Sequence, residues 1–276
     1  MTVREAIFEA SKQLAHVGNP VLDAQLLLAH VLNVPKISIL TDPARLLHED
    51  EQTSFRHLVS KREERIPIQY ILEQCEFMSL KFDITPDVLI PRGDTETLVE
   101  ATLKCLKGHD TARALDIGTG SGCIAVSLAH YAPQIEVDAM DISAAALKLA
   151  RQNAAKHAVD GRVTFMERDI FSDCSDLPKY HAIVSNPPYI KSDVIPTLQP
   201  EVSKFEPRAA LDGGADGLKF YRRLAEIAPF LVRKEGYVIL EIGENQLADI
   251  VKIFAGHPLL SINDLSGTPR TVIVHY

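Results

Sequence analysis

The feature that most constrains the fold is a regular alternation of strand and helix patterns from Arg113 onward. Short apolar runs bounded by turn residues predict strands at residues 113–117, 135–140, 162–167, 181–185, 236–242, 259–263 and 270–275. Amphipathic segments between them predict helices near residues 121–131, 143–157, 217–233 and 244–255. Such alternation indicates an α/β fold with a doubly wound, mainly parallel sheet.

The last two predicted strands differ from the others in how they are connected. The turn between them contains Gly267 and Pro269 and is too short for a parallel crossover. We therefore expect the last strand to run antiparallel. Doubly wound sheets bind ligands beyond the carboxyl ends of their strands, at the switch point of the strand order. Functional residues are thus expected in the turns that follow strands.

The chain divides into three regions by pattern. Residues 1–73 predict a helical bundle, with a capping box at Thr2 and further helices at about 21–32 and 49–65. Residues 74–90 predict a β-hairpin or extended linker, and a helix from about Thr95 to Lys107 opens the domain at 91–276. The bundle contains no catalytic constellation. We expect it to dock a partner, the alternative being a packing cap for the second domain.

Composition limits the classes of function. With 276 residues, 46% of them hydrophobic and 24% charged, the chain is typical of a soluble globular protein. Its formal net charge of -8 argues against a general nucleic-acid binder. No apolar stretch approaches the roughly 20 residues of a membrane helix, and the start lacks a signal-peptide pattern. The 4 cysteines are scattered without a CxxC pair, so we expect a reduced, cytoplasmic protein without a metal site.

A glycine-rich turn follows the first predicted strand of the sheet. It leads directly into a helix and consists of Gly118, Thr119, Gly120, Ser121 and Gly122. Glycines let the backbone turn sharply and approach a ligand, and a helix N-terminus favours negative charge such as a carboxylate. The spacing G-x-G-x-G differs from the G-x-G-x-x-G of dinucleotide sites. Taken alone, the pattern is equally compatible with a simple turn.

Acidic residues follow the next two predicted strands. Asp141 comes about 20 residues after the glycines, where a carboxylate can accept hydrogen bonds from both hydroxyls of a ribose. The alternative for Asp141 or Ser143 is a helix cap, and both roles can coexist. Asp169 follows the third strand and can face the amino group of an adenine, with Ile170 against the ring.

The most specific motif is Asn186-Pro187-Pro188-Tyr189, which follows the apolar strand at 181–185. Each proline fixes its φ and lacks an N–H, and a residue before proline is held extended. The Asn186 amide, the carbonyl of Pro187 or Pro188 and the Tyr189 ring therefore form a rigid polar rim. Such a rim suits a flat group that carries an NH2. The alternative is a purely structural loop.

The glycine turn, the two acids and the Asn-Pro-Pro-Tyr motif occur in the order used by S-adenosylmethionine-dependent methyltransferases. Together with the glycine turn, the motif resembles amino-methyltransferases that act on planar nitrogens. Three further stretches are similar to the HemK/PrmC family of release-factor glutamine methyltransferases: residues 91–96 (PRGDTE), residues 206–218 (EPRAALDGGADGL) and residues 23–28 (DAQLLL). The resemblance extends over nearly the whole chain.

This resemblance implies a Rossmann-like class I methyltransferase fold with a seven-stranded sheet, preceded by the helical bundle. It implies N5-methylation of the glutamine in the Gly-Gly-Gln motif of class 1 peptide chain release factors. S-adenosylmethionine would be the cofactor and S-adenosylhomocysteine the product. Catalysis would fall to Asn186, Pro187, Pro188 and Tyr189, and Asn186 would also contact the cofactor. An aromatic residue often stands at the position of Ile170 in the family. We expect a monomer that binds neither membrane nor nucleic acid directly.

Three other interpretations stay open from the residues alone. An adenine-N6 methyltransferase could use the same acceptors, with a flipped base on Tyr189. A glutamine methyltransferase for a ribosomal protein is closely related, and a cofactor-binding interaction protein without catalysis is a third. The segment containing Glu206, Pro207 and Arg208 is expected to lie beside the site. It would brace the Asn-Pro-Pro-Tyr motif through an Arg208 ion pair or contact the protein substrate.

Overall fold

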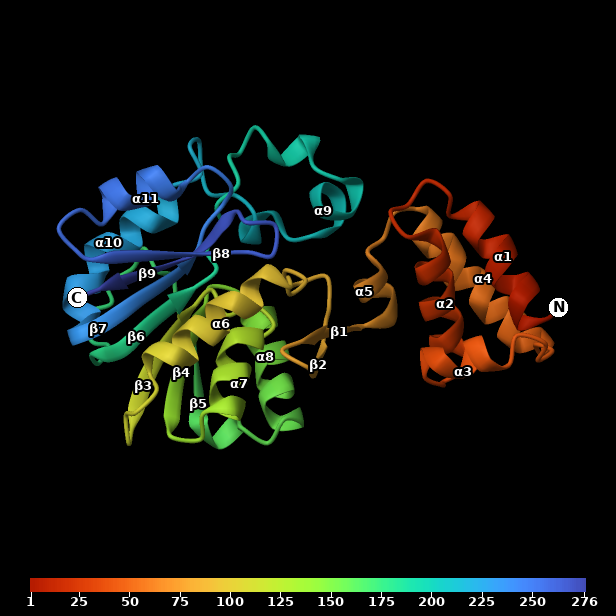
Figure 1. Ribbon diagram of the computed structural model, residues 1–276, viewed down its shortest axis with the longest axis horizontal. Coiled ribbons are helices and arrows are strands. Elements are labelled where there is room, and N and C mark those ends of the chain that lie inside the picture. The colour runs from red at the N-terminus through yellow and green to blue at the C-terminus, as the bar shows by residue number, and fades with distance from the viewer. The chain divides into compact units, whose positions relative to one another are not determined.

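The computed structural model describes residues 1–276, which form two compact units. The bundle unit comprises Met1–Gln74 together with Gln199–Phe205. The sheet unit comprises Cys75–Leu198 and Glu206–Tyr276. Figure 1 shows the elements of both units. No helix combines the length and apolar character that a membrane span requires.

The bundle unit consists of short helices around an apolar core. They are α1 (Val3–Gln13), α2 (Pro20–Val31), α3 (Lys36–Thr41), α4 (Glu49–Glu63), α5 (Ile68–Leu72) and α9 (Pro200–Phe205). Thr2 and Glu5 form the expected capping box of α1, and Pro20 occupies the first turn of α2. The sequence analysis did not anticipate α3 or α9.

Helix α9 belongs to the bundle unit because buried charges hold it there. The Arg62 side chain donates to Asp23 at 2.7 Å and to Glu201 of α9 at 3.0 Å. Arg65 adds a second bond to Glu201 at 2.5 Å. Asp23 and Arg62 are each 6% exposed, so these charges depend on one another for compensation. Residues 199–205, expected within the second domain, thus pack with the first unit.

The sheet unit is built on a seven-stranded sheet with the order β5-β4-β3-β6-β7-β9-β8. Its strands are β3 (Ala112–Ile117), β4 (Ile135–Asp141), β5 (Val163–Glu167), β6 (Tyr180–Ser185), β7 (Val232–Glu241), β8 (Leu259–Asn263) and β9 (Pro269–His275). Neighbouring strands from β5 to β7 pair in parallel, whereas β9 is antiparallel to both β7 and β8. The predicted fold class, including the antiparallel last strand, is confirmed.

Helices cover the sheet and occupy nearly the expected ranges. They are α6 (Asp94–Cys105), α7 (Cys123–Tyr131), α8 (Ala144–Lys156), α10 (Lys219–Leu231) and α11 (Leu247–Ile253). A two-stranded hairpin of β1 (Gln74–Phe77) and β2 (Leu80–Asp83) precedes them, and short 3-10 turns lie at Asp160–Arg162, Ile195–Thr197 and Arg208–Ala210. In Figure 1, α6, α7 and α8 lie together over one part of the sheet, and α10 lies beside α11.

Strand β3 marks the switch point of the sheet. Its two neighbours are β4 on one side and β6 on the other, so the chain winds away from β3 in both directions. Leu115 and Ile183, on these central strands, are fully buried in the hydrophobic core of the sheet unit. The rigid core therefore fixes the turns that follow β3, β4 and β6.

Candidate cofactor and substrate site

A cavity of about 610 Å³ opens at the carboxyl ends of the central strands. Most of the predicted site residues line it, namely Gly118, Gly120, Asp141, Asp169, Ile170, Asn186, Pro187 and Pro188. Four do not: Thr119, Ser121, Gly122 and Tyr189. The structure thus brings turns from β3, β4, β5 and β6 to one cavity, as expected for a sheet with this switch point.

The glycine turn after β3 combines two functions. Gly118 and Gly120 have φ of 76° and 54°, in the left-handed region, and a Cβ on either would meet nothing within 4 Å. The missing side chains therefore leave free space beside the backbone. Gly122 serves packing instead, because its Cβ would lie 3.0 Å from that of Ala150 in α8. Only the first two glycines face the cavity.

The Thr119 side chain holds the turn from the buried side. Its hydroxyl donates to the Asp116 carboxylate at 2.6 Å, and both side chains are buried. Burial raises the pKa of Asp116 to about 7, although the Thr119 hydrogen bond opposes the shift. Ser121 is also buried, 2% exposed. The Thr119 side chain therefore holds the turn through Asp116, and cofactor contacts of Thr119 and Ser121 stay a prediction.

Asp141 joins the turns that follow β3 and β4. One carboxylate oxygen accepts from the Gly120 N–H and the other from the Ser143 N–H, both at 2.9 Å. The N-cap of α8 is Ser143, whose hydroxyl accepts from Ala146. Each carboxylate oxygen of Asp141 can accept more than one bond, so acceptor capacity toward the cavity remains.

Aromatic side chains that the sequence analysis missed also line the cavity. Phe171 and Phe220 lie edge to face at 5.4 Å, and Lys219 Nζ is 4.6 Å from the Phe171 ring centroid. Ile170 is 6% exposed and belongs to the core. Asp169 accepts from the Phe171 N–H at 2.9 Å. The signal for Phe171 was its position next to Ile170, whereas nothing local pointed to Phe220.

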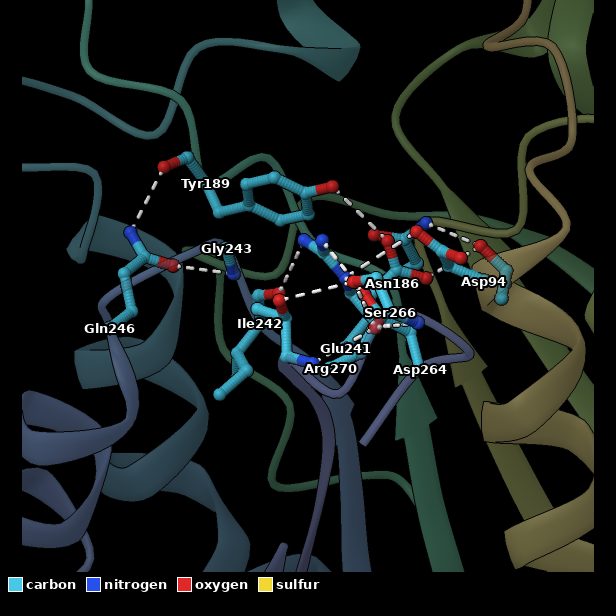
Figure 2. Close-up of polar contacts among 12 residues, drawn as sticks. Asp94, Asn186, Tyr189, Glu241, Ile242, Gly243, Gln246, Asp264, Ser266 and Arg270 are labelled. Atoms are coloured by element: carbon cyan, nitrogen blue, oxygen red, sulfur yellow. Dashed lines mark hydrogen bonds and ion pairs between the residues drawn. The ribbon is translucent and has the colours of Figure 1, made fainter. Parts of the chain in front are cut away.

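The Asn-Pro-Pro-Tyr motif is held by side chains from α6 and β7 (Figure 2). Asn186 Nδ2 donates to Thr95 Oγ1 at 3.1 Å, and Thr95 donates to Glu241 at 2.5 Å. The Tyr189 hydroxyl donates to the other Glu241 oxygen at 3.1 Å. The Tyr189 carbonyl accepts from Gln246 at 3.1 Å. Sequence analysis placed Thr95 only at the start of a predicted helix; that helix is α6, whose N-cap is Gly93.

These contacts determine where the Tyr189 side chain points. The phenol points toward Glu241, as Figure 2 shows, and Tyr189 is absent from the cavity lining. Burial, together with the nearby Glu241 carboxylate, raises the pKa of Tyr189, so the hydroxyl stays a donor. The hydroxyl and carbonyl of Tyr189 thus tie the motif to Glu241 and Gln246. Packing of its ring against a substrate stays a prediction.

Glu241 is the central acceptor of this network. It ends β7, is 1% exposed, and its pKa is raised by burial. The hydrogen bonds from Thr95 and Tyr189 and the charge of Arg270 oppose that shift. Arg270 lies 3.3 Å from Asp264 and 3.5 Å from Asp94. The buried carboxylate is thus surrounded by donors and one cation.

The segment at 206–214 braces the motif, although not through Arg208. Arg208 pairs with Asp212 in its own segment. The bracing contacts are backbone bonds from Ile190 N–H to Leu211 and from Gly213 N–H to Ile190, at 3.0 and 2.8 Å. Glu206 is bound by Arg92 at 2.5 Å. The expected brace is present, but it is made of main-chain contacts that residue types cannot predict.

Comparison with known proteins agrees with this arrangement. A methyltransferase small domain matches residues 94–199, and a PrmC N-terminal domain matches residues 5–72. The hMettl16 catalytic domain, solved in complex with MAT2A 3'UTR hairpin 6, shares the fold with a TM-score of 0.56 at 15% identity, covering 86% of this chain and 85% of that one. Fold and site thus define a class I methyltransferase of the S-adenosylmethionine-dependent type.

Proteins of similar sequence identify the family to which this methyltransferase belongs. The chain is 40% identical over 256 residues to a release factor glutamine methyltransferase of Geobacter sulfurreducens, covering 92% of this chain and 88% of the relative. It is 43% identical over 248 residues to that of Moorella thermoacetica, with coverages of 89% and 87%. A Clostridium acetobutylicum relative is 34% identical over 279 residues, with coverages of 99% and 98%. The chain belongs to the release factor glutamine methyltransferase family.

Proposed function

We propose that this enzyme transfers a methyl group from S-adenosylmethionine to the side-chain nitrogen of the glutamine in the Gly-Gly-Gln motif of class 1 release factors. The observation that carries the proposal is the position of Asn186 and Pro187 on the wall of the same cavity as the glycine turn. The names of the relatives support the substrate. The methyl donor and the glutamine that receives the methyl group would then bind in one cavity.

The residues present fit S-adenosylmethionine. Gly118 and Gly120 leave open space beside the backbone, where the amino-acid part would lie. Asp141 would accept from the ribose hydroxyls, and Asp169 with Ile170 would contact the adenine. The bound cofactor supplies a methyl group activated by a positively charged sulfur. The remaining task of the protein is to orient a weak nucleophile.

An amide nitrogen is a weak nucleophile because its lone pair is delocalised into the carbonyl. The Asn186 side-chain oxygen would accept one N–H of the substrate amide, and a backbone carbonyl would accept the other. The Pro188 oxygen lies against Gly213, where a Cβ would come within 2.8 Å of it. This crowding favours Pro187 as the second acceptor. Both acceptors stabilise the positive charge that develops on nitrogen during transfer.

Alignment supplies the remaining rate enhancement. Holding the nitrogen in line with the methyl carbon can contribute roughly 7–11 kcal/mol. The two prolines keep the acceptors fixed before the substrate arrives. The site needs no dedicated base, because the nitrogen becomes cationic on methylation and its proton can pass to water.

We also propose that the bundle unit contributes to binding of the release factor. Its surface exposes large apolar side chains, with Phe8 58%, Ile37 63% and Leu46 69% exposed. Exposed apolar side chains of this size are typical of protein contacts when they gather in a patch. Substitution of Ile37 by Asp would test this role through the KM for the intact release factor. A short Gly-Gly-Gln peptide serves as the control substrate.

The decisive experiment uses labelled S-adenosylmethionine with purified release factor, ribosomal proteins and DNA in separate reactions. We expect label only on the release factor, located at the glutamine by mass spectrometry. Asn186→Ala should lower transfer by roughly 10²-fold or more and leave cofactor affinity near normal. Label on ribosomal protein or DNA, or full turnover by Asn186→Ala, would contradict the proposal.

A further inference from the structure

The chemistry of one hydroxyl group, that of Thr95, bears on which way the Asn186 amide faces. The two ends of a carboxamide have nearly the same shape, so their hydrogen-bond partners determine which end faces the cavity. Only the oxygen of Asn186 can accept an N–H of a substrate amide. A reversed side chain would present an NH2 to the substrate NH2, and the two donors would repel.

The position of Thr95 can determine which end of the Asn186 carboxamide faces the cavity. It lies in the first turn of α6, is 2% exposed, and its Oγ1 is 3.1 Å from Asn186 Nδ2 and 2.5 Å from Glu241 Oε2. A hydroxyl carries a single proton. If that proton is used toward Glu241, the oxygen of Thr95 can only accept from Asn186. The partner on Asn186 must then be its nitrogen.

Glu241 in turn determines where the Thr95 proton goes. An ionised carboxylate accepts and cannot donate. Its other oxygen accepts from the Tyr189 hydroxyl at 3.1 Å. Both Glu241 oxygens thus accept from hydroxyl donors; burial raises the Glu241 pKa, and these hydrogen bonds and the charge of Arg270 oppose that rise. Glu241 follows Leu240, which pairs with Ser185, the residue before Asn186. Adjacent parallel strands therefore bring Glu241 and Asn186 to one edge of the sheet.

We propose that Thr95 and Glu241 are positioning residues, which hold the Asn186 nitrogen toward α6 and its oxygen toward the substrate carboxamide. This inference rests on the proposed function for the identity of the substrate. The orientation itself is a property of the enzyme alone. Neither Thr95 nor Glu241 lines the cavity, so their effect passes through Asn186.

The main test is Thr95→Val, which keeps the shape and removes the hydroxyl. We expect kcat for release factor to fall about tenfold or more, with unchanged cofactor affinity by calorimetry. Thr95→Ser should restore most of the loss. The matched control is Thr102→Val, because Thr102 is a fully buried residue of the same helix whose hydroxyl donates to the Leu98 carbonyl. It should leave kcat unchanged.

A double variant distinguishes positioning from general damage. In the Asn186→Ala background, Thr95→Val should cost no further turnover, since its effect passes through Asn186. Equal fold-losses in both backgrounds would overturn the inference. Glu241→Gln replaces an obligate acceptor by a group that can donate to Thr95. We expect reduced turnover with normal cofactor affinity. Wild-type turnover would show that Glu241 does not help to orient Asn186.

A second readout needs no substrate. NMR of the ¹⁵N-labelled enzyme identifies the Asn186 side-chain amide as the signal that is lost in Asn186→Ala. We expect its hydrogen exchange to speed up about tenfold or more in Thr95→Val and to stay slow in Thr102→Val. Unchanged exchange in Thr95→Val would overturn the proposal that Thr95 orients Asn186. Failure of the wild type to methylate release factor would overturn the proposed function and leave the exchange result valid.

Discussion

Gly213 and Pro188 pack backbone against backbone: a Cβ on Gly213 would lie 2.8 Å from the Pro188 carbonyl oxygen and from the Tyr189 Cα. We expect Gly213→Ala to displace the motif, reduce turnover about tenfold or more and destabilise the protein by about 1–3 kcal/mol. Steady-state kinetics and thermal unfolding would measure both effects. In Gly161→Ala, the control, the new methyl group meets nothing within 4 Å. Wild-type behaviour of both variants would disprove the packing argument.

Asp141→Ala should weaken cofactor binding. The variant loses the expected ribose acceptor and the bond to the Gly120 N–H, so we expect an affinity loss of about 10- to 100-fold by calorimetry. Lys148→Ala is the control, because Lys148 is an exposed residue of α8 that does not line the cavity. That variant should keep both its stability and its affinity. Unchanged affinity in Asp141→Ala would leave this residue as a structural link alone.

Asp116 should make stability depend on pH. Its pKa, raised to about 7 by burial, exceeds the unfolded value of 3.8, so the folded state holds the proton more tightly. The resulting stabilisation is complete below about pH 4 and is lost as the pH rises through about 7, by at most ~4 kcal/mol. Chemical unfolding at several pH values should show this slope in the wild type and a smaller one in Asp116→Asn. Equal slopes would refute the assignment; the exposed Asp110 provides a control position.

Breaking the buried ion pairs of the bundle unit should lower the free energy of unfolding substantially. Arg62→Met leaves Asp23 without its ion-pair partner and removes one of the two from Glu201, so we expect a loss of about 3–5 kcal/mol. Arg45→Met is the control, because Arg45 pairs with Glu51 at a side-chain exposure of 37%. A loss of about 0–1 kcal/mol is expected there. Denaturation of the full chain would show whether the two variants differ; similar stabilities would contradict a structural role for the network.

Local pattern was sufficient for the strands of the large sheet. The β3 to β9 strands appear within a few residues of the predicted ranges, because alternation and apolar runs are properties of neighbouring residues. The antiparallel last strand followed from the length of one turn. Helix α9 was missed because its place depends on Arg62 and Arg65, more than 130 residues earlier in the chain. Short helices of this kind carry little periodic signal of their own.

By itself, the sequence determined which strand ends carry functional residues, since turn chemistry at Gly118, Asp141 and Asn186 is encoded locally. Only the tertiary structure decided what each of these side chains contacts. It turned Tyr189 toward Glu241, placed Thr95 beneath Asn186 and assigned the brace to Gly213. These contacts join residues that are 50 or more positions apart or depend on main-chain packing, and a pattern confined to neighbouring residues contains neither.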